Sequence, residues 1–338
     1  MTRKIVSALG LLLLAGCAAP GPPPSPPPRL VWPPPPEPAR IRYVGSIASP
    51  EDIEGRKSWL RRVWEAVVGR TEARILRPYG LWVDGDGRLY VADSAARAVH
   101  IFDRRARSYR AVTRIGARRL EMPIGLAVGP DGILYLTDSE LRTVAALGKK
   151  GELLREFGSD LQRPTGLALS PAGDRIYVVD TLSHEVAIFD PSGRRLGTIG
   201  RRGTGDGELN FPTNVAVDRA GLLYVTDTMN FQVKIFAPDG TPAGKFGRLG
   251  DGTGDLSRPK GIGVDSDGHI YVVEGLYDHF QIFDPRGRFL LAVGGTGTGP
   301  GRFWLPTSLH IDREDRIYVA DSYNNRVQIF QYLKGPRP

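Results

Sequence analysis

Residues 212–247 read PTNVAVDRAGLLYVTDTMNFQVKIFAPDGTPAGKFG, and this stretch decides the fold. It contains four short runs rich in β-branched and aromatic residues, separated by Gly, Pro, Asp and Asn. Runs of this length with turn residues between them are typical of antiparallel strands. The proline at the start of the first run stands where a missing N–H group is tolerated. The stretch therefore predicts a four-stranded antiparallel sheet.

The same pattern recurs six times along the chain. Successive opening prolines are 41 residues apart at the closest (Pro123 to Pro164) and 48 at the widest (Pro164 to Pro212). A period of this length indicates a repeat architecture. Apolar runs such as IYVVD at 176–180 suit strands that are covered on both faces. The repeats therefore predict an all-β, six-bladed β-propeller of four-stranded antiparallel blades. Each copy places a tyrosine three residues before an acid: Tyr90, Tyr135, Tyr177, Tyr224, Tyr271 and Tyr318 precede Asp93, Asp138, Asp180, Asp227, Glu274 and Asp321.

The sixth copy provides only three strands, over 306–312, 316–321 and 326–331. Upstream of the first copy, residues 41–48 begin IRYVGSI, which resembles the outermost strands of other copies. We expect this segment to complete the sixth blade and close the ring, because closure removes exposed sheet edges. The predicted propeller domain therefore covers 41–331.

The motif P-x-G-[LIV]-x-[VI]-D, followed by [IL]-Y-V-x-D-[ST] and V-x-I-F, resembles the NHL repeat over residues 78–330. Among the departures from it, the second copy has Leu147 in place of Phe, the fifth has Glu274-Gly275 in place of Asp-Ser or Asp-Thr, and the sixth has Ser308 in place of Gly and His310 at a position that is usually small. The resemblance implies an NHL-repeat six-bladed β-propeller of the bacterial lipoprotein type.

The N-terminus predicts export and a lipid anchor. Residues 1–17 start with a basic pair and continue into a short apolar run, as in a signal peptide. The run ends in LAGC, which resembles the bacterial lipobox and implies lipidation of Cys17, the only cysteine in the chain. The alternative is a signal peptide with an incidental cysteine. Ala18 follows, so we expect the bacterial cell envelope, anchored by lipid in the outer membrane and facing the periplasm or the surface.

Two segments stand outside the repeats. Residues 18–40 are rich in proline, with twelve prolines among the nineteen residues from Pro20 to Pro38. Such a run favours extended polyproline II, so a tether is predicted; a proline-rich ligand for a partner domain is the alternative. Residues 55–69 place Trp59 and Trp64 on an apolar face opposite a basic one, which predicts a helical insert. The helix either packs on the propeller or docks on a membrane or partner.

In a propeller, the loops before the inner strands and the loops between second and third strands share one face. Arg77, Arg163 and Arg258 each precede a repeat proline and could form an anion-binding rim, unless each pairs with an acid of its own blade. Aromatic and guanidinium groups there match the composition of protein interfaces. The candidate binding residues on this face are Arg77, Tyr79, Arg163, His184, Asn214, Arg258, Lys260, Tyr277, His279, Tyr323, Asn325 and Arg326.

The six recurring acids form a ring that looks like a cation site. Their recurrence at one repeat position instead predicts a structural role, in which each carboxylate accepts hydrogen bonds from backbone N–H groups of a turn. Glu274 is longer by one methylene than the aspartates at this position. It is therefore the member of the ring with a candidate functional role.

Metal lyases of the NHL class use several histidines around the channel, and calcium-dependent propeller lactonases use converging acids and amides. The five histidines of this chain, His100, His184, His269, His279 and His310, differ in their repeat positions. No metal, cofactor or catalytic residue is therefore expected, and the chain is interpreted as a binding or scaffold module of the envelope. The alternative is a metal-dependent enzyme of lyase or lactonase type at the channel mouth.

The formal charge of +8 restricts the class of partner. Such a charge suits nucleic acid, anionic surfaces or acidic proteins. An exported lipoprotein meets the last two and not nucleic acid, so envelope proteins are the expected partners, extracytoplasmic redox proteins among them. The lipid on Cys17 would be the contact with the membrane.

Overall fold

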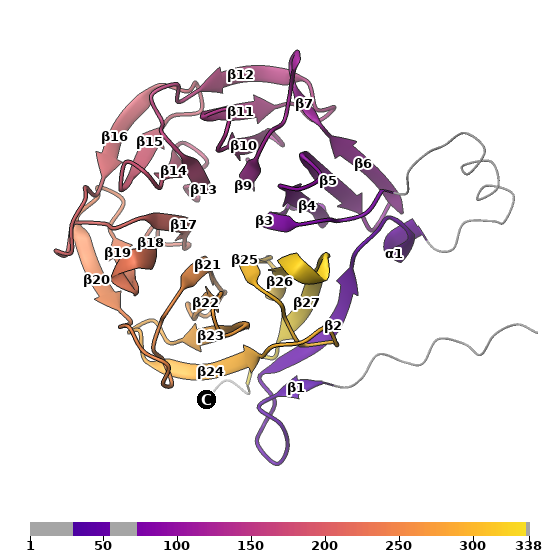
Figure 1. Ribbon diagram of the computed structural model, residues 1–338, viewed down its shortest axis with the longest axis vertical. Coiled ribbons are helices and arrows are strands. Elements are labelled where there is room, and N and C mark those ends of the chain that lie inside the picture. The colour runs from indigo at the N-terminus through magenta and orange to yellow at the C-terminus, as the bar shows by residue number, and fades with distance from the viewer. Residues whose placement is uncertain (1–29, 55–72, 336–338) are drawn as a thin grey trace, which may run out of the picture.

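The computed structural model describes residues 30–54 and 73–335, and these form six blades around a central channel (Figure 1). The predicted all-β six-bladed propeller is confirmed. Blade one contains β3 (Pro78–Val83), β4 (Arg88–Asp93), β5 (Ala98–Asp103) and β6 (Ser108–Val112). A hairpin of β7 (Arg114–Ile115) and β8 (Arg118–Arg119) follows. Blade two contains β9 (Pro123–Val128), β10 (Leu134–Asp138), β11 (Thr143–Leu147) and β12 (Leu153–Phe157).

The remaining blades repeat this plan. Blade three contains β13 (Pro164–Leu169), β14 (Ile176–Asp180), β15 (Glu185–Phe189) and β16 (Arg195–Ile199). Blade four contains β17 (Pro212–Val217), β18 (Leu223–Asp227), the 3₁₀ helix η1 (Thr228–Asn230), β19 (Gln232–Phe236) and β20 (Pro242–Phe246). Blade five contains β21 (Pro259–Val264), β22 (Ile270–Glu274), β23 (His279–Phe283) and β24 (Phe289–Gly294). The first strand of each blade lines the channel, and each such strand contacts the next around the ring.

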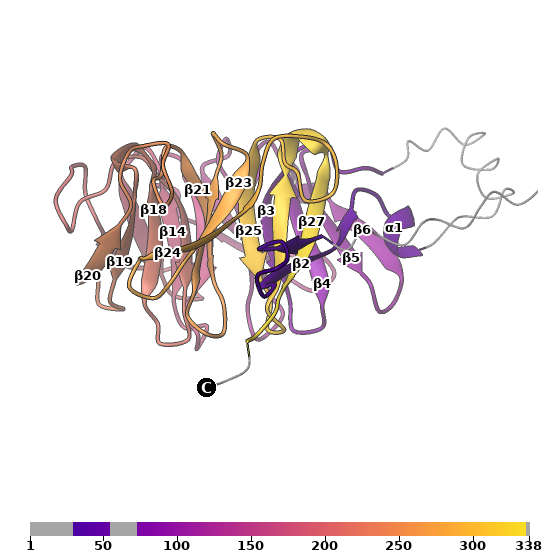
Figure 2. The ribbon, with the colours of Figure 1, turned by 90° about the horizontal axis from the view of Figure 1, so that it is seen from below.

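Blade six is built from both ends of the chain. It contains β25 (Pro306–Ile311), β26 (Arg316–Asp321), the 3₁₀ helix η2 (Ser322–Asn324) and β27 (Arg326–Tyr332). The strand β2 (Ile41–Ile47) pairs antiparallel with β27, with Tyr43 opposite Phe330. Figure 2 shows the indigo β2 lying against the yellow β27. The predicted closure of the ring by residues 41–48 is confirmed.

A second N-terminal strand extends this blade. The strand β1 (Val31–Trp32) pairs with β2, which makes blade six five-stranded. The ring of Trp32 packs at 5.8 Å from that of Phe330, centroid to centroid. Residues 30–40, the part of the predicted 18–40 tether that the structure describes, therefore belong to the propeller. They begin with the apolar Leu-Val-Trp, of which Val31 and Trp32 pair with β2 and Trp32 packs on Phe330 of β27. Cys17, residues 18–29 and the predicted helix 55–69 lie outside the described residues, which include only the short helix α1 (Glu51–Glu54) before the insert.

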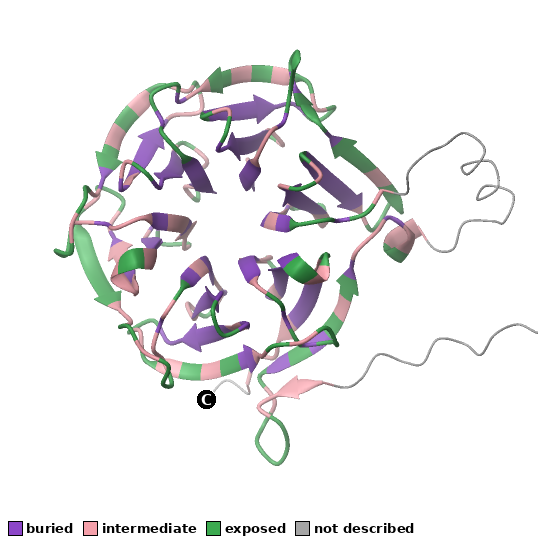
Figure 3. Ribbon diagram, viewed as in Figure 1, coloured by how far each residue is buried: buried purple, intermediate pink, exposed green. Residues whose placement is uncertain are grey.

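Burial explains the sequence pattern of the strands. The second and third strands of each blade are almost wholly buried, whereas the outermost strands are largely exposed or partly covered (Figure 3). The repeated tyrosine adds a polar contact to this core. The Tyr271 hydroxyl donates to Asp265 at 3.0 Å, and Tyr90, Tyr224 and Tyr318 make the equivalent bond. In these four blades the tyrosine thus ties the second strand to the turn that precedes it.

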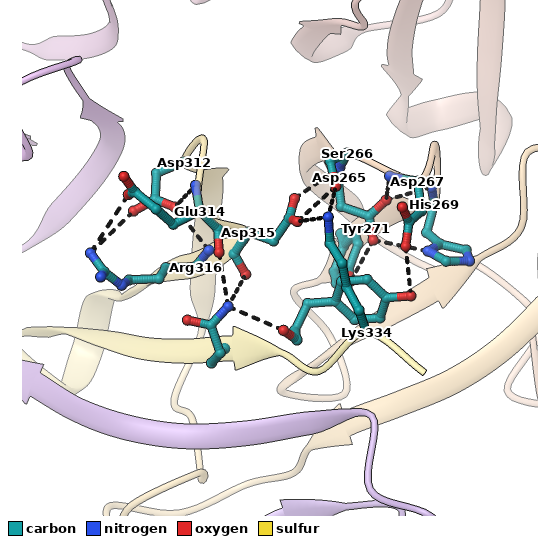
Figure 4. A network of polar contacts seen from close by, with 12 residues as sticks. Asp265, Ser266, Asp267, His269, Tyr271, Asp312, Glu314, Asp315, Arg316 and Lys334 are labelled. Atoms are coloured by element: carbon teal, nitrogen blue, oxygen red, sulfur yellow. Dashed lines mark hydrogen bonds and ion pairs between the residues drawn. The ribbon is translucent and has the colours of Figure 1, made fainter. Parts of the chain in front are cut away.

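The end of β27 is fastened to blade five by a polar network (Figure 4). Asp315 accepts hydrogen bonds from the backbone and hydroxyl of Ser266 at 2.9 and 2.7 Å, and it pairs with Lys334 at 3.1 Å. Asp265 in the same turn contacts His269 at 2.9 Å. Among the described helices, none has the length and hydropathy needed to cross a bilayer.

Candidate functional site

The recurring acids organise one face of the propeller. Asp93 accepts hydrogen bonds from the backbone N–H groups of Leu76 and Arg77, just before the inner strand β3. It also accepts one from the backbone N–H group of Ala96, in the loop between the second and third strands. The predicted turn-capping role is confirmed. Each acid holds the loop before an inner strand against the loop between the second and third strands. We call the face formed by these two sets of loops the channel-mouth face.

Glu274 has the same role as the aspartates. Its carboxylate accepts from the backbone N–H groups of Ser257 and Arg258 at 2.9 and 2.8 Å, and the side chain is fully buried. Glu274 therefore makes the structural contacts that the aspartates make, and a function beyond them stays a prediction. The glutamate reaches the same loop that an aspartate reaches in the other blades.

Four of the predicted binding residues meet at the mouth of the channel. The ammonium of Lys260, in blade five, lies 5.8 Å from the ring centroid of Tyr79, in blade one. Burial raises the pKa of the Tyr79 hydroxyl, and the positive charges of Arg163 and Arg258 act against that rise. Arg163 and Arg258 thus add positive charge to the surroundings of the phenol. Blades one, three and five contribute to a single cluster.

The cluster of Tyr79, Arg163, Arg258 and Lys260 is cationic and includes no carboxylate. Burial, with the nearby charge of Arg258, lowers the pKa of Lys260 to about 8. Within residues 30–54 and 73–335, no ion pair joins Arg77, Arg163, Arg258 or Lys260 to an acid. The alternative in which each arginine pairs with an acid of its own blade is therefore wrong for these residues.

Below the cluster, the channel is narrow because the inner strands approach closely. A Cβ atom on Gly166 would lie 2.6 Å from the Cα of Asn214, and one on Gly261 would lie 2.5 Å from the Cα of Ser308. The glycine of the repeat motif is therefore required by packing. Blades four and six carry Asn214 and Ser308 at this position instead, and the Asn214 amide reaches the Ser308 hydroxyl at 3.5 Å across the channel.

A stack of aromatic and cationic side chains lies on the rim of the mouth. The Trp304 ring is 5.8 Å from the Tyr323 ring, and the guanidinium of Arg77 lies 5.4 Å from the centroid of Tyr323. Trp304 and Tyr323 are about half exposed, at 49% and 47%. Trp304 is absent from the predicted binding residues. Its position could have indicated it, because it stands two residues before a repeat proline and the rim arginines stand one residue before theirs.

Exposed apolar side chains are concentrated on the same face. Of the twelve large hydrophobic residues that are exposed in the described chain, four lie on outer strands and the other eight in loops of the channel-mouth face. The loops of the opposite face contribute none among the described residues. The eight are Leu76, Leu182, Met229, Leu249, Leu276, Tyr277, Trp304 and Tyr323.

The other predicted residues lie on this face but have structural contacts. Arg326 pairs with Asp321 at 2.8 Å and donates to backbone carbonyls of the preceding loop. His184 accepts from the Phe211 backbone N–H at 3.1 Å. The side-chain amide of Asn325 donates to the backbone carbonyl oxygens of Tyr323 and Leu76. His279 stacks on Tyr277 with the two rings 10° apart.

The donors in the channel do not fit a catalytic zinc or calcium ion. Zinc in enzymes needs three converging protein ligands, and calcium needs several oxygen ligands that include carboxylates. The described channel lining offers one imidazole, His310, and no carboxylate. His310 is itself engaged: its ring packs 4.5 Å from Trp82, and it hydrogen-bonds to the backbone of Val83.

Comparisons with known proteins agree with this architecture. A family model described as "6-bladed beta-propeller" matches residues 264–333, and the NHL repeat model matches residues 209–236. No curated protein matches the chain significantly.

Among solved structures, similar chains share the fold at low sequence identity. A protein of unknown function from Bacteroides thetaiotaomicron is 18% identical, with a TM-score of 0.61 over 77% of this chain and 70% of its own. The virginiamycin B lyase of Staphylococcus aureus is 15% identical, with a TM-score of 0.57 over 76% and 95%. A gluconolactonase from Xanthomonas campestris is 19% identical, with a TM-score of 0.58 over 79% and 93%. At this level of identity the likeness shows the fold alone. The blade architecture and the two family matches together identify the chain as a six-bladed β-propeller with an NHL repeat at residues 209–236.

Proposed function

We propose that this protein is a lipid-anchored binding module of the bacterial cell envelope, and that it docks an acidic protein on the channel-mouth face. The observation that carries the proposal is the uneven distribution of exposed apolar side chains, eight of twelve on one face and none in the loops of the other, among the described residues. Concentrations of this kind mark interaction surfaces, whereas scattered single residues do not.

The charge on this face supports an acidic partner. Arg77, Arg163, Arg258 and Lys260 surround the mouth without a carboxylate of their own within the described residues. The rim stack of Trp304, Tyr323 and Arg77 adds the residue types that dominate binding energy at protein interfaces. An acidic surface with an apolar centre would complement both features.

Attachment to the membrane is supported by the sequence alone. The lipobox-like LAGC places Cys17 at the start of the mature chain, and the described propeller begins at residue 30. A short tether of this kind would keep the propeller near the bilayer and its partner near the membrane. Replacing Cys17 by Ser should move the protein from the membrane fraction to the soluble fraction and abolish incorporation of labelled fatty acid. Unchanged fractionation would contradict the anchor.

The docking proposal is tested by capture from envelope extracts with tagged, lipidated protein. We expect an acidic protein to be captured by the wild type, lost with the Trp304→Ala, Tyr323→Ala variant, and released as salt is raised. The matched control is Leu154→Ala, Leu196→Ala, which removes apolar side chains of similar exposure from outer strands. Nuclease treatment should leave the capture unchanged. Equal capture by the two double variants, or loss on nuclease treatment, would contradict the proposal.

A further inference from the structure

The channel mouth presents several hydrogen-bond donors to one small volume. Lys260 and Tyr79 face each other at 5.8 Å, and Arg163 and Arg258 act electrostatically on the Tyr79 hydroxyl. These residues come from blades one, three and five, so they are far apart in the sequence and their proximity depends on the closed ring. Their side chains make no ion pair with an acid within the described residues.

The bottom of the mouth is polar as well. The amide of Asn214 and the hydroxyl of Ser308 approach to 3.5 Å across the channel, where four other blades carry glycine. Amide and hydroxyl groups donate hydrogen bonds to anionic oxygens. The two departures from the repeat motif therefore add donors at the level just below the cations.

Size limits what can enter. The channel cavity has a volume of about 110 Å³. Pockets that enclose a whole small-molecule ligand measure roughly 300–1,000 Å³, and one water occupies about 30 Å³ of liquid. The channel thus has room for one terminal group of a ligand and a few waters, and the rest of that ligand would lie on the channel-mouth face.

Electrostatics determine the charge of that group. Burial removes Lys260 from water, and the guanidinium of Arg258 acts on it as well, so the pKa of Lys260 falls to about 8. An unpaired cation in such a place is destabilised, and an anion that bound there would relieve both the repulsion and the loss of solvation. Guanidinium and ammonium groups together are the usual recognition elements for carboxylates and phosphates.

We infer that the channel mouth binds one carboxylate group of the docked protein, with Lys260, Arg163 and Arg258 as counter-charges and with Tyr79 and Asn214 as hydrogen-bond donors. This inference rests on the proposed function, because the carboxylate would be a side chain or the C-terminus of the partner. It adds to that function a defined anchor point at the centre of the docking face.

The test is a titration of the lysine side chains by NMR in the full-length protein labelled at lysine Cε and Nζ. The chain has only eight lysines, so the Lys260 signal can be assigned from its loss in Lys260→Met. We expect saturating acetate to raise the pKa of Lys260 by one unit or more. Lys245, which is exposed and paired with Asp206, is the internal control and should not respond.

Removing the arginines separates a specific site from general screening by salt. In Arg163→Met, Arg258→Met, acetate should no longer shift the Lys260 signal in the same concentration range, and sodium chloride should not reproduce the acetate effect in the wild type. No response to acetate, a response to inorganic phosphate alone, or an equal response in the double variant would overturn the inference. If capture of the partner still depended on Trp304 and Tyr323 in that case, the proposed function would stand without this anchor point.

Discussion

The ammonium of Lys234 lies 3.4 Å from the carboxylate of Asp227, and both side chains are buried in blade four. Lys234 also donates to the carbonyl oxygens of Gly205 and Glu208, in the glycine-rich loop that leads into the blade. Blades five and six place Gln281 and Gln328 at the same repeat position, where they hold the equivalent loops. A long polar side chain at this position thus fastens a blade-linking loop.

Breaking this pair should destabilise the protein strongly. In Lys234→Met the buried carboxylate of Asp227 loses its counter-charge, so we expect the free energy of unfolding to fall by about 3–5 kcal/mol. Lys234→Gln should cost less, because blades five and six hold their loops with glutamine. Urea denaturation of both variants checks this. A loss below about 1 kcal/mol in Lys234→Met would show that the pair does not matter for stability.

Because β2 closes the ring, replacing an inward-facing residue of this strand should destabilise the protein more than replacing its outward-facing neighbour. Tyr43 is buried and its ring lies 5.6 Å from that of Phe330, whereas Val44 points outwards. Tyr43→Ala should therefore lower the free energy of unfolding by about 3–5 kcal/mol, and Val44→Ala by less than about 1 kcal/mol. Thermal melting of the two variants provides the comparison. Similar melting temperatures would mean that the strand is not part of the core.

Glu274 should affect stability without affecting binding. In Glu274→Ala the N–H groups of Ser257 and Arg258 lose their acceptor, and we expect a cost of about 1–3 kcal/mol. Glu274→Asp should be milder, because five blades perform this capping with aspartate. Both variants should still capture the partner under conditions where they are folded. A fully stable Glu274→Ala that failed to capture would restore a functional role.

The stability of the protein should fall as the pH drops from about 6.5 to 4. Burial lowers the pKa of His310 to about 4, so the neutral imidazole is the form that the fold favours. Above about 6.5, histidine is neutral in both states; below it, the unfolded chain takes up the proton first and the fold loses stability. The difference between a pKa of about 6.5 in the unfolded chain and about 4 in the fold corresponds to at most about 3 kcal/mol at pH 4.

Replacing His310 by alanine, which three other inner strands carry at this position, should flatten this pH dependence. The cavity left beside Trp82 lowers stability at every pH, so the slope and not the absolute value is the readout. Burial also lowers the pKa values of His184 and His279, which should keep part of the slope. Parallel stability curves for the variant and the wild type between pH 4 and 7 would contradict the assignment.

The sequence was sufficient for the blades because the information there is local. Each tyrosine, capping acid and opening proline recurs within one repeat, and each makes contacts within its own blade or with the adjoining loop. The closing strand was also predictable, because IRYVGSI matches the pattern of an outermost strand and the sixth copy lacked one. The position of a residue within its repeat therefore predicts the strand to which it belongs and the strands that pair with that strand.

The channel mouth could be predicted only in part. The face was evident from the loops, but the approach of Lys260 to Tyr79 and of Asn214 to Ser308 joins blades that are not adjacent and depends on the diameter of the closed ring. Composition did not indicate that residues 30–40 pack on the propeller. The high proline content around Trp32 predicted an extended tether, although the apolar Trp32 packs on the last strand. Contacts across a closed ring need the three-dimensional structure.

Hydrogen exchange measured by mass spectrometry, on the protein alone and with its captured partner, tests the docking face most directly. We expect slower exchange in the partner-bound protein at residues 76–79, 275–278 and 322–326 of the channel-mouth face. The turns of the opposite face, at 84–87 and 265–269, should exchange at the same rate in both samples. Protection of those turns, with the channel-mouth loops unchanged, would contradict the account.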